Sequence, residues 1–247
     1  MHLHLAGSLV VMSMMLLRTA QGMKSFAPPG TMGAVRGARV PRAKVSELFA
    51  KGFFGVSSSS ASAEKDPGAV AGTHLRVLKY PHPQLRGENA PITAFDEALA
   101  KEAREMLLVM YAADGIGLAA PQVGLNKRLM VFNEKGEADE SAFEMVLANP
   151  TIVARADEED LKEEGCLSFP IIYGKVHRAT WIEVQYNTLA GDTVTERFEG
   201  VPARIFQHEY DHLDRTLFID RLVEEDRLKM QRRLNKMVKK YGPGGAV

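Results

Sequence analysis

Two histidines four residues apart, His208 and His212, are the side chains of this sequence best suited to chemistry. An α-helix turns once in about 3.6 residues, so positions i and i+4 lie on one face and both imidazoles can reach the same cation. Glu209 lies beside the first histidine and need not bind the cation, which leaves its carboxylate free as a general base. This H-E-x-x-H pattern predicts a metal site on a helix.

A catalytic metal site needs a third protein ligand and one open position. The first acid after the pattern is Asp214, which would lie close to the opposite face of the helix from His212, and no histidine follows. The other candidate is Cys166, the only cysteine, in a loop-like segment between a glycine and a proline. A thiolate with two imidazoles suits Zn²⁺ or Fe²⁺ in tetrahedral geometry, so Cys166, His208 and His212 are a plausible set of ligands.

Three blocks of the sequence resemble the three motifs of peptide deformylases, in that family's order and at its usual spacings. They are Gly-Ile-Gly-Leu-Ala-Ala-Pro-Gln at residues 115–122, Glu-Gly-Cys-Leu-Ser at 164–168 and Gln-His-Glu-Tyr-Asp-His-Leu at 207–213. The resemblance extends over residues 75–241, and the tyrosine in the third block is similar to the plant-plastid and cyanobacterial branch. Arg215 stands at a position that is commonly glycine in the family, and there we expect an altered helix end rather than lost activity.

The resemblance implies that the chain hydrolyses the N-formyl group of N-formylmethionine in new polypeptides and releases formate. It assigns the metal to the three ligands above, and it assigns proton transfer, from water to the leaving methionine amine, to Glu209. The donors for the developing oxyanion would be the metal, the backbone N–H of Leu167 and the side-chain amide of Gln122. The loss of one such donor typically costs about 2.7–4 kcal/mol of transition-state stabilisation.

We expect the substrate to be bound by residues from these blocks and from two neighbouring segments. They are Gly115, Ile116, Gly117, Glu164, Gly165, Tyr173 and Ile205. Core packing explains Ile205 nearly as well, and Glu164 is either a solvated acid or a group that orders the pocket. Gly115 and Gly117 either serve the turn alone or let an extended peptide bind against the backbone like an added strand.

Several other polar residues allow only a general interpretation. Asp211 and Asp214 either contact a ligand imidazole from behind or are solvated at the surface. His74, His82 and His177 have no partner pattern, and we expect them to be structural or exposed.

Ligand softness and geometry allow Fe²⁺, Zn²⁺, Co²⁺ or Ni²⁺, and we expect Fe²⁺ natively. The partners that we expect are N-formylmethionyl nascent peptides and the organellar ribosome near its exit tunnel, with no direct nucleic-acid specificity and no membrane. Two other functions stay open. A zincin-type metalloendopeptidase would take its third ligand after His212 instead of Cys166. A catalytically inactive deformylase-like protein would bind nascent chains without hydrolysis.

The first 73 residues are predicted to be targeting sequence rather than part of the fold. Residues 5–17 are nearly all apolar, which is too short for a membrane-spanning helix but typical of a signal peptide, so we assign residues 1–22 to a signal-peptide-like segment. Residues 23–73 resemble a transit peptide without fixed structure. Over residues 1–73, eight Lys and Arg against three Asp and Glu give a net charge of +5. A two-part leader predicts delivery to the plastid stroma, with the mitochondrion as the alternative.

Residues 74–242 are predicted to form one catalytic domain, followed by a flexible tail at 243–247. Asp96 can cap a helix whose apolar residues recur at helical spacing from Leu99 to Met110. Strand patterns follow at residues 129–132, 145–148 and 152–154, and in a hairpin over 181–188 and 193–198. The order of elements predicts an α+β fold: a single domain of mostly antiparallel strands around the central metal-binding helix, with a C-terminal helix.

The C-terminal helix, at about residues 224–241, is predicted to bury one apolar stripe and to leave its Lys and Arg in solvent. The stripe consists of Leu228, Leu234, Met237, Val238 and Tyr241. The chain's net charge of +0 argues against a dedicated nucleic-acid-binding protein. Its single cysteine excludes an internal disulfide.

Overall fold

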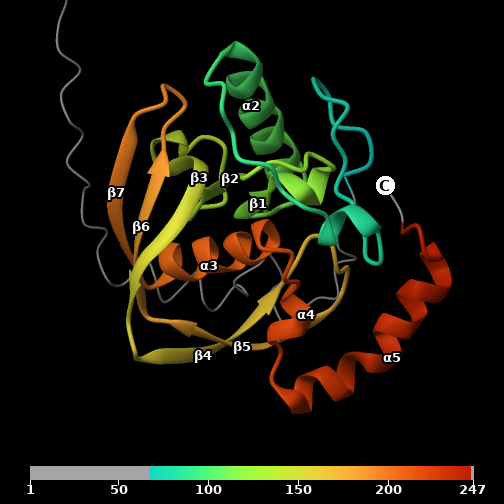
Figure 1. Ribbon diagram of the computed structural model, residues 1–247. Helices are drawn as coiled ribbons and strands as arrows, with labels where there is room; N and C mark the ends of the chain where they lie inside the picture. The colour runs from blue at the N-terminus through green and yellow to red at the C-terminus, as the bar shows by residue number, and fades with distance from the viewer. Residues whose placement is uncertain (1–66, 246–247) are drawn as a thin grey trace, which may run out of the picture. The chain divides into compact units, whose positions relative to one another are not determined.

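The structure is a computed structural model that describes residues 67–245 (Figure 1). The predictions for residues 1–66 lie outside the described residues. The last part of the predicted leader is described, and there the Thr73 hydroxyl donates a hydrogen bond to Glu105 at 3.0 Å. Packing against the domain therefore begins before residue 74. Of the described helices, none is long and apolar enough to cross a membrane.

A five-stranded antiparallel sheet in the order β1-β2-β3-β6-β7 forms the centre of the domain. Its strands are β1 (Gly117–Ala119), β2 (Leu129–Asn133), β3 (Glu144–Arg155), β6 (Trp181–Asn187) and β7 (Thr193–Glu199). Every residue of β2 is buried. Met130 and Phe132 join one apolar cluster, whereas Leu129 and Val131 join another, because successive side chains of a strand point to opposite faces. Both faces of the sheet are therefore covered.

Each face of the sheet packs against one helix. The helix α2 (Glu97–Ala112) contributes Met106, Val109 and Met110 to the cluster on one face. It begins as predicted, since the Asp96 side chain accepts a hydrogen bond from the Leu99 N–H at 3.0 Å.

The helix α3 (Val201–Leu213) covers the other face and carries the H-E-x-x-H pattern, with Pro202 in its first turn. On its far side lies an antiparallel ribbon of β4 (Glu159–Gly165) and β5 (Tyr173–Ala179), so that α3 runs between the sheet and the ribbon (Figure 1). The metal-binding helix is thereby buried on two sides.

A third apolar cluster joins the segment after Cys166 to β5 and to the last two helices, α4 (Phe218–Arg221) and α5 (Glu224–Tyr241). The aromatic contacts Tyr80–Phe169 and Phe169–Phe218 continue through it, with ring centroids 5.0 and 5.6 Å apart. Short 3₁₀ turns connect the elements: η1 (Pro83–Arg86), η2 (Ala120–Val123) and η3 (Ser141–Phe143).

The predicted fold class is confirmed: an α+β domain of antiparallel strands around the central helix, with a C-terminal helix. Two details are wrong. The strands predicted at 145–148 and 152–154 are one strand, β3, whose pairing with β6 shifts register on either side of Thr151. On α5, Leu234 and Met237 are buried, but Leu228 is 67% exposed and Val238 42% exposed, because only one side of this helix meets the domain.

Candidate metal centre

The three predicted metal ligands lie together in the interior. The ligand atoms of Cys166, His208 and His212 all lie within 4.8 Å of one another, and all three residues are buried. The Cys166 Sγ atom lies 3.4 Å from His212 Nε2. This cysteine follows directly after β4, while the two histidines project from successive turns of α3. The ribbon and the helix thus bring a thiol to a pair of imidazoles that are more than 40 residues away in sequence.

The chemistry of this cluster fits one divalent cation. His208 Nδ1 lies 2.9 Å from Glu164 Oε2, and a hydrogen bond there leaves Nε2 of the same ring for a metal. Although burial opposes a charged imidazole, hydrogen bonds with Cys166 and Glu164 raise the pKa of His208 to about 10. The surroundings of His208 therefore favour positive charge on that ring, whereas burial and the neighbouring His208 lower the pKa of His212 and keep its imidazole neutral, the form that binds a metal. A thiolate and two imidazoles are the ligand types that Zn²⁺ and Fe²⁺ accept.

Glu164 is held in place by two buried arginines. Its carboxylate accepts hydrogen bonds from Arg178 Nε at 3.1 Å, Arg178 Nη2 at 3.0 Å and Arg204 Nη1 at 2.6 Å. Although burial alone would raise it, the pKa of Glu164 is held well below its usual range by the Arg178 guanidinium and His208. The interpretation as a solvated acid is wrong, because the residue is only 1% exposed. Since protein groups use both oxygens, we assign Glu164 to holding His208 rather than to substrate contact.

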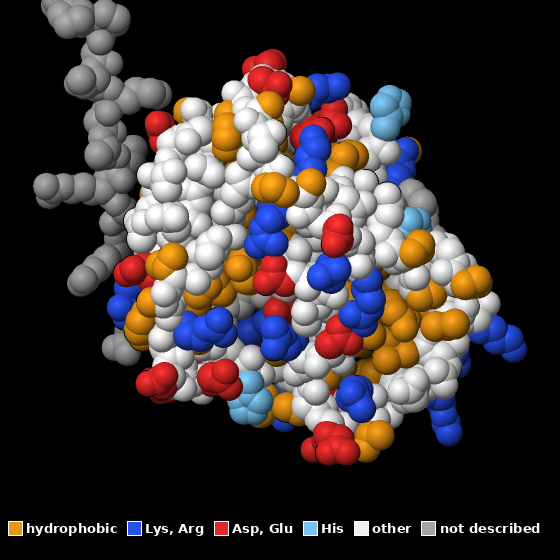
Figure 2. Space-filling model, in the orientation of Figure 1, with side chains coloured by type: hydrophobic (Ala, Val, Ile, Leu, Met, Phe, Trp, Pro, Cys, Tyr) orange, Lys and Arg blue, Asp and Glu red, His pale blue; other side chains and the backbone are white. Residues whose placement is uncertain are grey.

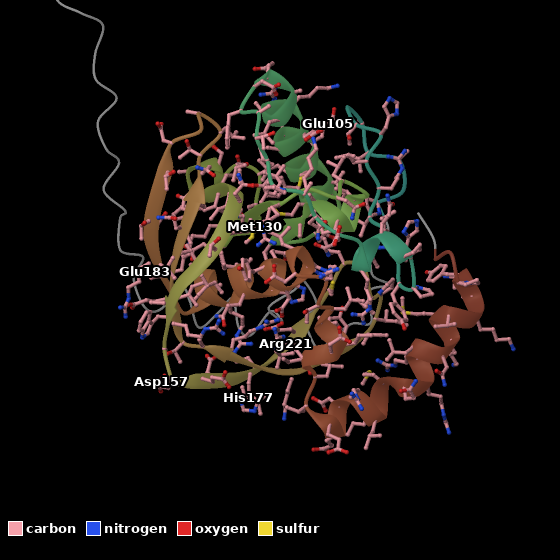
Figure 3. The ribbon with its side chains drawn as sticks, in the orientation of Figure 1. Glu105, Met130, Asp157, His177, Glu183 and Arg221 are labelled. Atoms are coloured by element: carbon pink, nitrogen blue, oxygen red, sulfur yellow. The ribbon has the colours of Figure 1, made fainter. Side chains whose placement is uncertain are left out.

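Asp211 and Asp214 contact arginines instead of a ligand imidazole. Asp211 is buried and pairs with Arg178 at 2.5 Å and with Arg221 at 2.8 Å. Figure 3 shows Arg221, at the end of α4, near α3. Asp214 ends α3 and pairs with Arg128 at 2.9 Å at the surface. Asp211 therefore reaches the ligands only through the chain Asp211–Arg178–Glu164–His208, and the surface interpretation holds for Asp214.

Glu209 is a buried carboxylate that lacks one hydrogen bond. It is 1% exposed, and its Oε2 atom has no hydrogen-bond partner among the described residues. Burial raises the pKa of Glu209 to about 7. A carboxyl group that titrates near neutrality, with one oxygen free, is suited to accept and return a proton.

The two predicted oxyanion donors approach the cluster from separate loops. Gln122 is 1% exposed, and its Oε1 atom accepts a hydrogen bond from the Ala119 N–H at 2.8 Å, which fixes the direction of the amide. Its Nε2 atom points to Cys166 Sγ and Ser168 Oγ, each at 3.5 Å. The Leu167 N–H donates to no described residue. Both donors therefore lie beside the thiol, and the contacts of the Gln122 amide there are long.

Gly115 and Gly117 allow close packing inside the protein. A Cβ atom on Gly117 would lie 2.5 Å from Glu209 Oε1 and 2.9 Å from Ile205 Cγ2, and one on Gly115 would lie 2.8 Å from Leu167 Cδ1. Neither glycine adopts a positive φ. Their first role is thus to let Glu209 and Leu167 approach the backbone.

The other predicted substrate residues surround the cluster at different depths. Gly165 and Tyr173 face each other at the end of the β4–β5 ladder next to Cys166, and Ile116 is partly buried. Ile205 is fully buried in the core, which agrees with the core-packing interpretation.

Two of the remaining histidines have their contacts defined. His82 accepts a hydrogen bond from the Gln84 N–H at the start of η1, a structural role. His177 lies at the outer edge of the ribbon with its side chain 55% exposed (Figure 3).

The sequence interpretation missed the two buried arginines. Arg204 lies four residues before His208, on the same face of α3, and Arg178 shares the buried face of β5 with Val176 and Gly174. Both spacings were visible in the sequence, but charged residues are seldom fully buried unless paired. Their acidic partners come from other elements.

Comparison with known proteins gives consistent matches. A family model described as Polypeptide deformylase matches residues 74–228. The chain is 45% identical over 169 residues to Peptide deformylase 1B, chloroplastic/mitochondrial, of Arabidopsis thaliana, a match that covers 68% of this chain and 62% of that protein. It therefore spans slightly less than two thirds of that relative's length.

A bacterial relative and a solved structure extend the similarity. Peptide deformylase of Thermotoga neapolitana is 42% identical over 164 residues, which cover 66% of this chain and 96% of that protein. A crystal structure of a plant peptide deformylase matches with a TM-score of 0.67 and 45% identity, over 68% of this chain and 91% of the other.

Proposed function

Since this chain belongs to the polypeptide deformylase family, we propose that it hydrolyses the N-formyl group of N-formylmethionine at the start of new polypeptides. The observation that carries the proposal is the meeting of Cys166 with His208 and His212. A zincin-type endopeptidase would need a ligand downstream of His212. The acids next in sequence instead pair with arginines: Asp214 with Arg128, and Asp220 with Arg86.

In the proposed reaction, water adds to the formyl carbon, the carbon–nitrogen bond breaks, and formate and a free methionine amine result. A divalent ion held by Cys166, His208 and His212 would lower the pKa of a bound water toward neutrality. Glu209 accepts the proton of the attacking water at Oε2, the atom that has no hydrogen-bond partner within residues 67–245, and passes it to the leaving amine.

Negative charge on the formyl oxygen is stabilised by donors that are already in place. The Leu167 N–H and the Gln122 Nε2 group lie on the two loops beside Cys166. The bond from the Ala119 N–H to Gln122 Oε1 fixes the amide, so a formyl oxygen has to replace only the 3.5 Å contacts of Nε2 with Cys166 and Ser168. Fixed donors stabilise a developing charge more than mobile ones, because no reorganisation is needed during the reaction.

We propose that the methionine side chain enters the site between the first block and the end of the ribbon. Ile116, Gly165 and Tyr173 supply that wall, with Ile205 behind it. The nascent peptide would run past Gly115 and Gly117 in an extended conformation.

We propose Fe²⁺ as the native ion, with Zn²⁺, Co²⁺ and Ni²⁺ as ions that the same ligands accept. Metal analysis after anaerobic purification, matched to activity, tests this assignment. Activity that follows the zinc content rather than the iron content would contradict it.

We further propose that the protein acts in the plastid stroma, with the mitochondrion as the alternative. The two-part leader and the chloroplastic names of similar plant proteins support this location. A fluorescent fusion of the full leader, compared with one that begins at Met23, tests it. Mitochondrial fluorescence of the full fusion would favour the alternative.

A basic surface on α5 supports a ribosomal partner. The acids of this helix stand in its first turn, and the residues after them include seven Lys and Arg but no Asp or Glu. Figure 2 shows Lys and Arg side chains on this part of the surface. We propose that the helix approaches the phosphate-rich surface of the organellar ribosome without sequence-specific contacts. Co-sedimentation with ribosomes that is unchanged after Lys236, Lys239 and Lys240 become Glu would contradict the proposal.

Formate release tests the main function. The chain, loaded anaerobically with Fe²⁺ or Co²⁺, is incubated with formyl-Met-Ala-Ser and, separately, with an unformylated longer peptide. A deformylase releases formate from the first and leaves the second intact. Cleavage inside the second peptide would favour an endopeptidase, and binding without any product would favour an inactive nascent-chain-binding protein.

A further inference from the structure

Lys79 is a buried lysine that the proposed reaction does not use. The residue is 4% exposed, and its ammonium group donates a hydrogen bond to the Leu167 carbonyl oxygen at 2.9 Å. None of the ion pairs among the described residues involves it. Burial of a lysine without an acidic partner is unfavourable unless its hydrogen bonds compensate, so a buried lysine here indicates a specific role for its ammonium group.

The backbone on either side of Lys79 joins the two loops that hold the oxyanion donors. The Leu78 N–H donates to the Gln122 carbonyl at 2.7 Å, and the Tyr80 N–H donates to the Ser168 carbonyl at 2.9 Å. The direct side-chain contacts between these loops, from Gln122 Nε2, are longer, at 3.5 Å. Residues 78–80 therefore set the spacing between the Gln122 amide and the segment that contains Leu167.

Within this connection, Lys79 contacts the residue whose N–H is the proposed donor. Its hydrogen bond fixes the peptide unit that contains the Leu167 carbonyl. This unit adjoins, across the Leu167 Cα atom, the peptide unit that carries the Leu167 N–H, and so limits how far that unit can turn. A bond from an ammonium is shorter and stronger than one from a neutral group. A buried positive charge against the loop of Leu167 also favours a negative charge that develops beside it.

We propose that Lys79 is a positioning residue: its ammonium holds the Leu167 carbonyl so that the Leu167 N–H points to the formyl oxygen of the substrate. The inference rests on the proposed deformylase function. The alternative is a packing role, in which only the aliphatic part of the Lys79 side chain fills space in the interior.

Two variants separate these roles. Lys79→Met keeps the length and apolar volume but removes the donor, whereas Lys79→Gln keeps a neutral donor. Lys127→Met is the matched control, since Lys127 pairs with Glu102 at 2.7 Å and contacts no residue of the site. The full chain is used, loaded with Co²⁺, and kcat, KM, metal content and melting temperature are measured with formyl-Met-Ala-Ser.

We expect Lys79→Met to lower kcat about 10- to 100-fold, less than the roughly 100- to 1000-fold loss typical of removing one oxyanion donor, because the Leu167 N–H is displaced and not lost. The KM of Lys79→Met should change less than threefold, and the variant should bind one metal per chain. The kcat of Lys79→Gln should lie between that of Lys79→Met and that of the unsubstituted chain. Hydrogen exchange of the peptide covering residues 164–170 should be faster in Lys79→Met. The Lys127→Met control should keep the kcat of the unsubstituted chain.

A kcat of Lys79→Met within twofold of the unsubstituted chain would overturn the inference, as would a loss of kcat that only follows a loss of metal. Failure of both Lys79 variants to fold would assign Lys79 to stability and also overturn it. If the unsubstituted chain itself released no formate, the proposed function would fail, and the inference with it.

Discussion

His208 Nδ1 lies 2.9 Å from Glu164 Oε2, and this contact connects a metal ligand to a buried network of charges. The carboxylate is held from behind by Arg178 and Arg204. Arg178 continues to Asp211 on the same helix as the histidine. The orientation of the imidazole is thus set by groups from β4, β5 and α3 together.

Replacement of Glu164 by Gln should weaken metal binding about 10- to 100-fold, the usual effect of losing such a support behind a ligand. The amide has no charge to hold the His208 N–H or to balance the two arginines. Competition with a chelator gives the metal affinity. Glu163→Gln is the control, because Glu163 is the exposed neighbour on β4. Equal affinities for the two variants would contradict this role.

Replacement of Cys166 by Ser should remove most of the bound metal while the domain still folds, since a neutral hydroxyl replaces a thiolate ligand. Metal content per chain and the circular dichroism spectrum check the two halves of this expectation. A variant that retains one metal per chain at native affinity would instead favour a third ligand downstream of His212.

Replacement of Glu209 by Gln should lower kcat about 10²- to 10⁴-fold and leave the metal bound, because general acid–base catalysis contributes that much. The measurement is kcat for formyl-Met-Ala-Ser at equal metal content. An unchanged kcat would remove Glu209 from proton transfer.

Gly117→Ala should act on the same carboxylate without changing it. The added Cβ would lie 2.5 Å from Glu209 Oε1, so the side chain or the helix must move. Overpacking of this kind costs about 1–3 kcal/mol of stability, and we expect kcat to fall as well. Gly244→Ala is the control, because a Cβ there meets nothing within 4 Å. Native stability and kcat in Gly117→Ala would show that the contact is not needed.

Arg215→Gly should stabilise the protein by up to about 1 kcal/mol without changing kcat. Arg215 has a φ of 62°, the left-handed conformation that favours glycine, just after the end of α3. The altered helix end that the sequence predicted therefore destabilises the folded backbone at Arg215. The free energy of unfolding is measured in urea, with Arg215→Ala as the control that keeps a Cβ atom. Equal stability of the Gly and Ala variants would contradict the explanation.

How far the sequence predicts this fold depends on whether a pattern is local. The cap Asp96 and the apolar spacing after it define α2, and Trp181 to Phe198 define a hairpin, because each signal lies within one element. The ribbon was missed. In β4 the only apolar side chain before Gly165 is Leu161, which is 45% exposed, so no alternating apolar face marks the strand.

The parts of the site that lie within one motif were predictable, and the contacts between elements were not. The ligands and Glu209 follow from short motifs, but the partners of Arg178 and Arg204 come from separate elements, and nothing local pairs them. Lys79 was missed for the same reason. Its acceptor is 88 residues away, on a loop that meets it only after the domain has folded.

The central claim is hydrolysis of a formyl amide at the site of Cys166, His208 and His212. It is tested most directly by turnover of formyl-Met-Ala-Ser in water enriched in ¹⁸O, with the metal-loaded chain and Glu209→Gln side by side. We predict one ¹⁸O atom in each released formate, none in the Met-Ala-Ser product, and a rate at least about 100-fold lower for the variant. Label in a new peptide carboxylate, or formate release that is equal in both chains, would contradict the account.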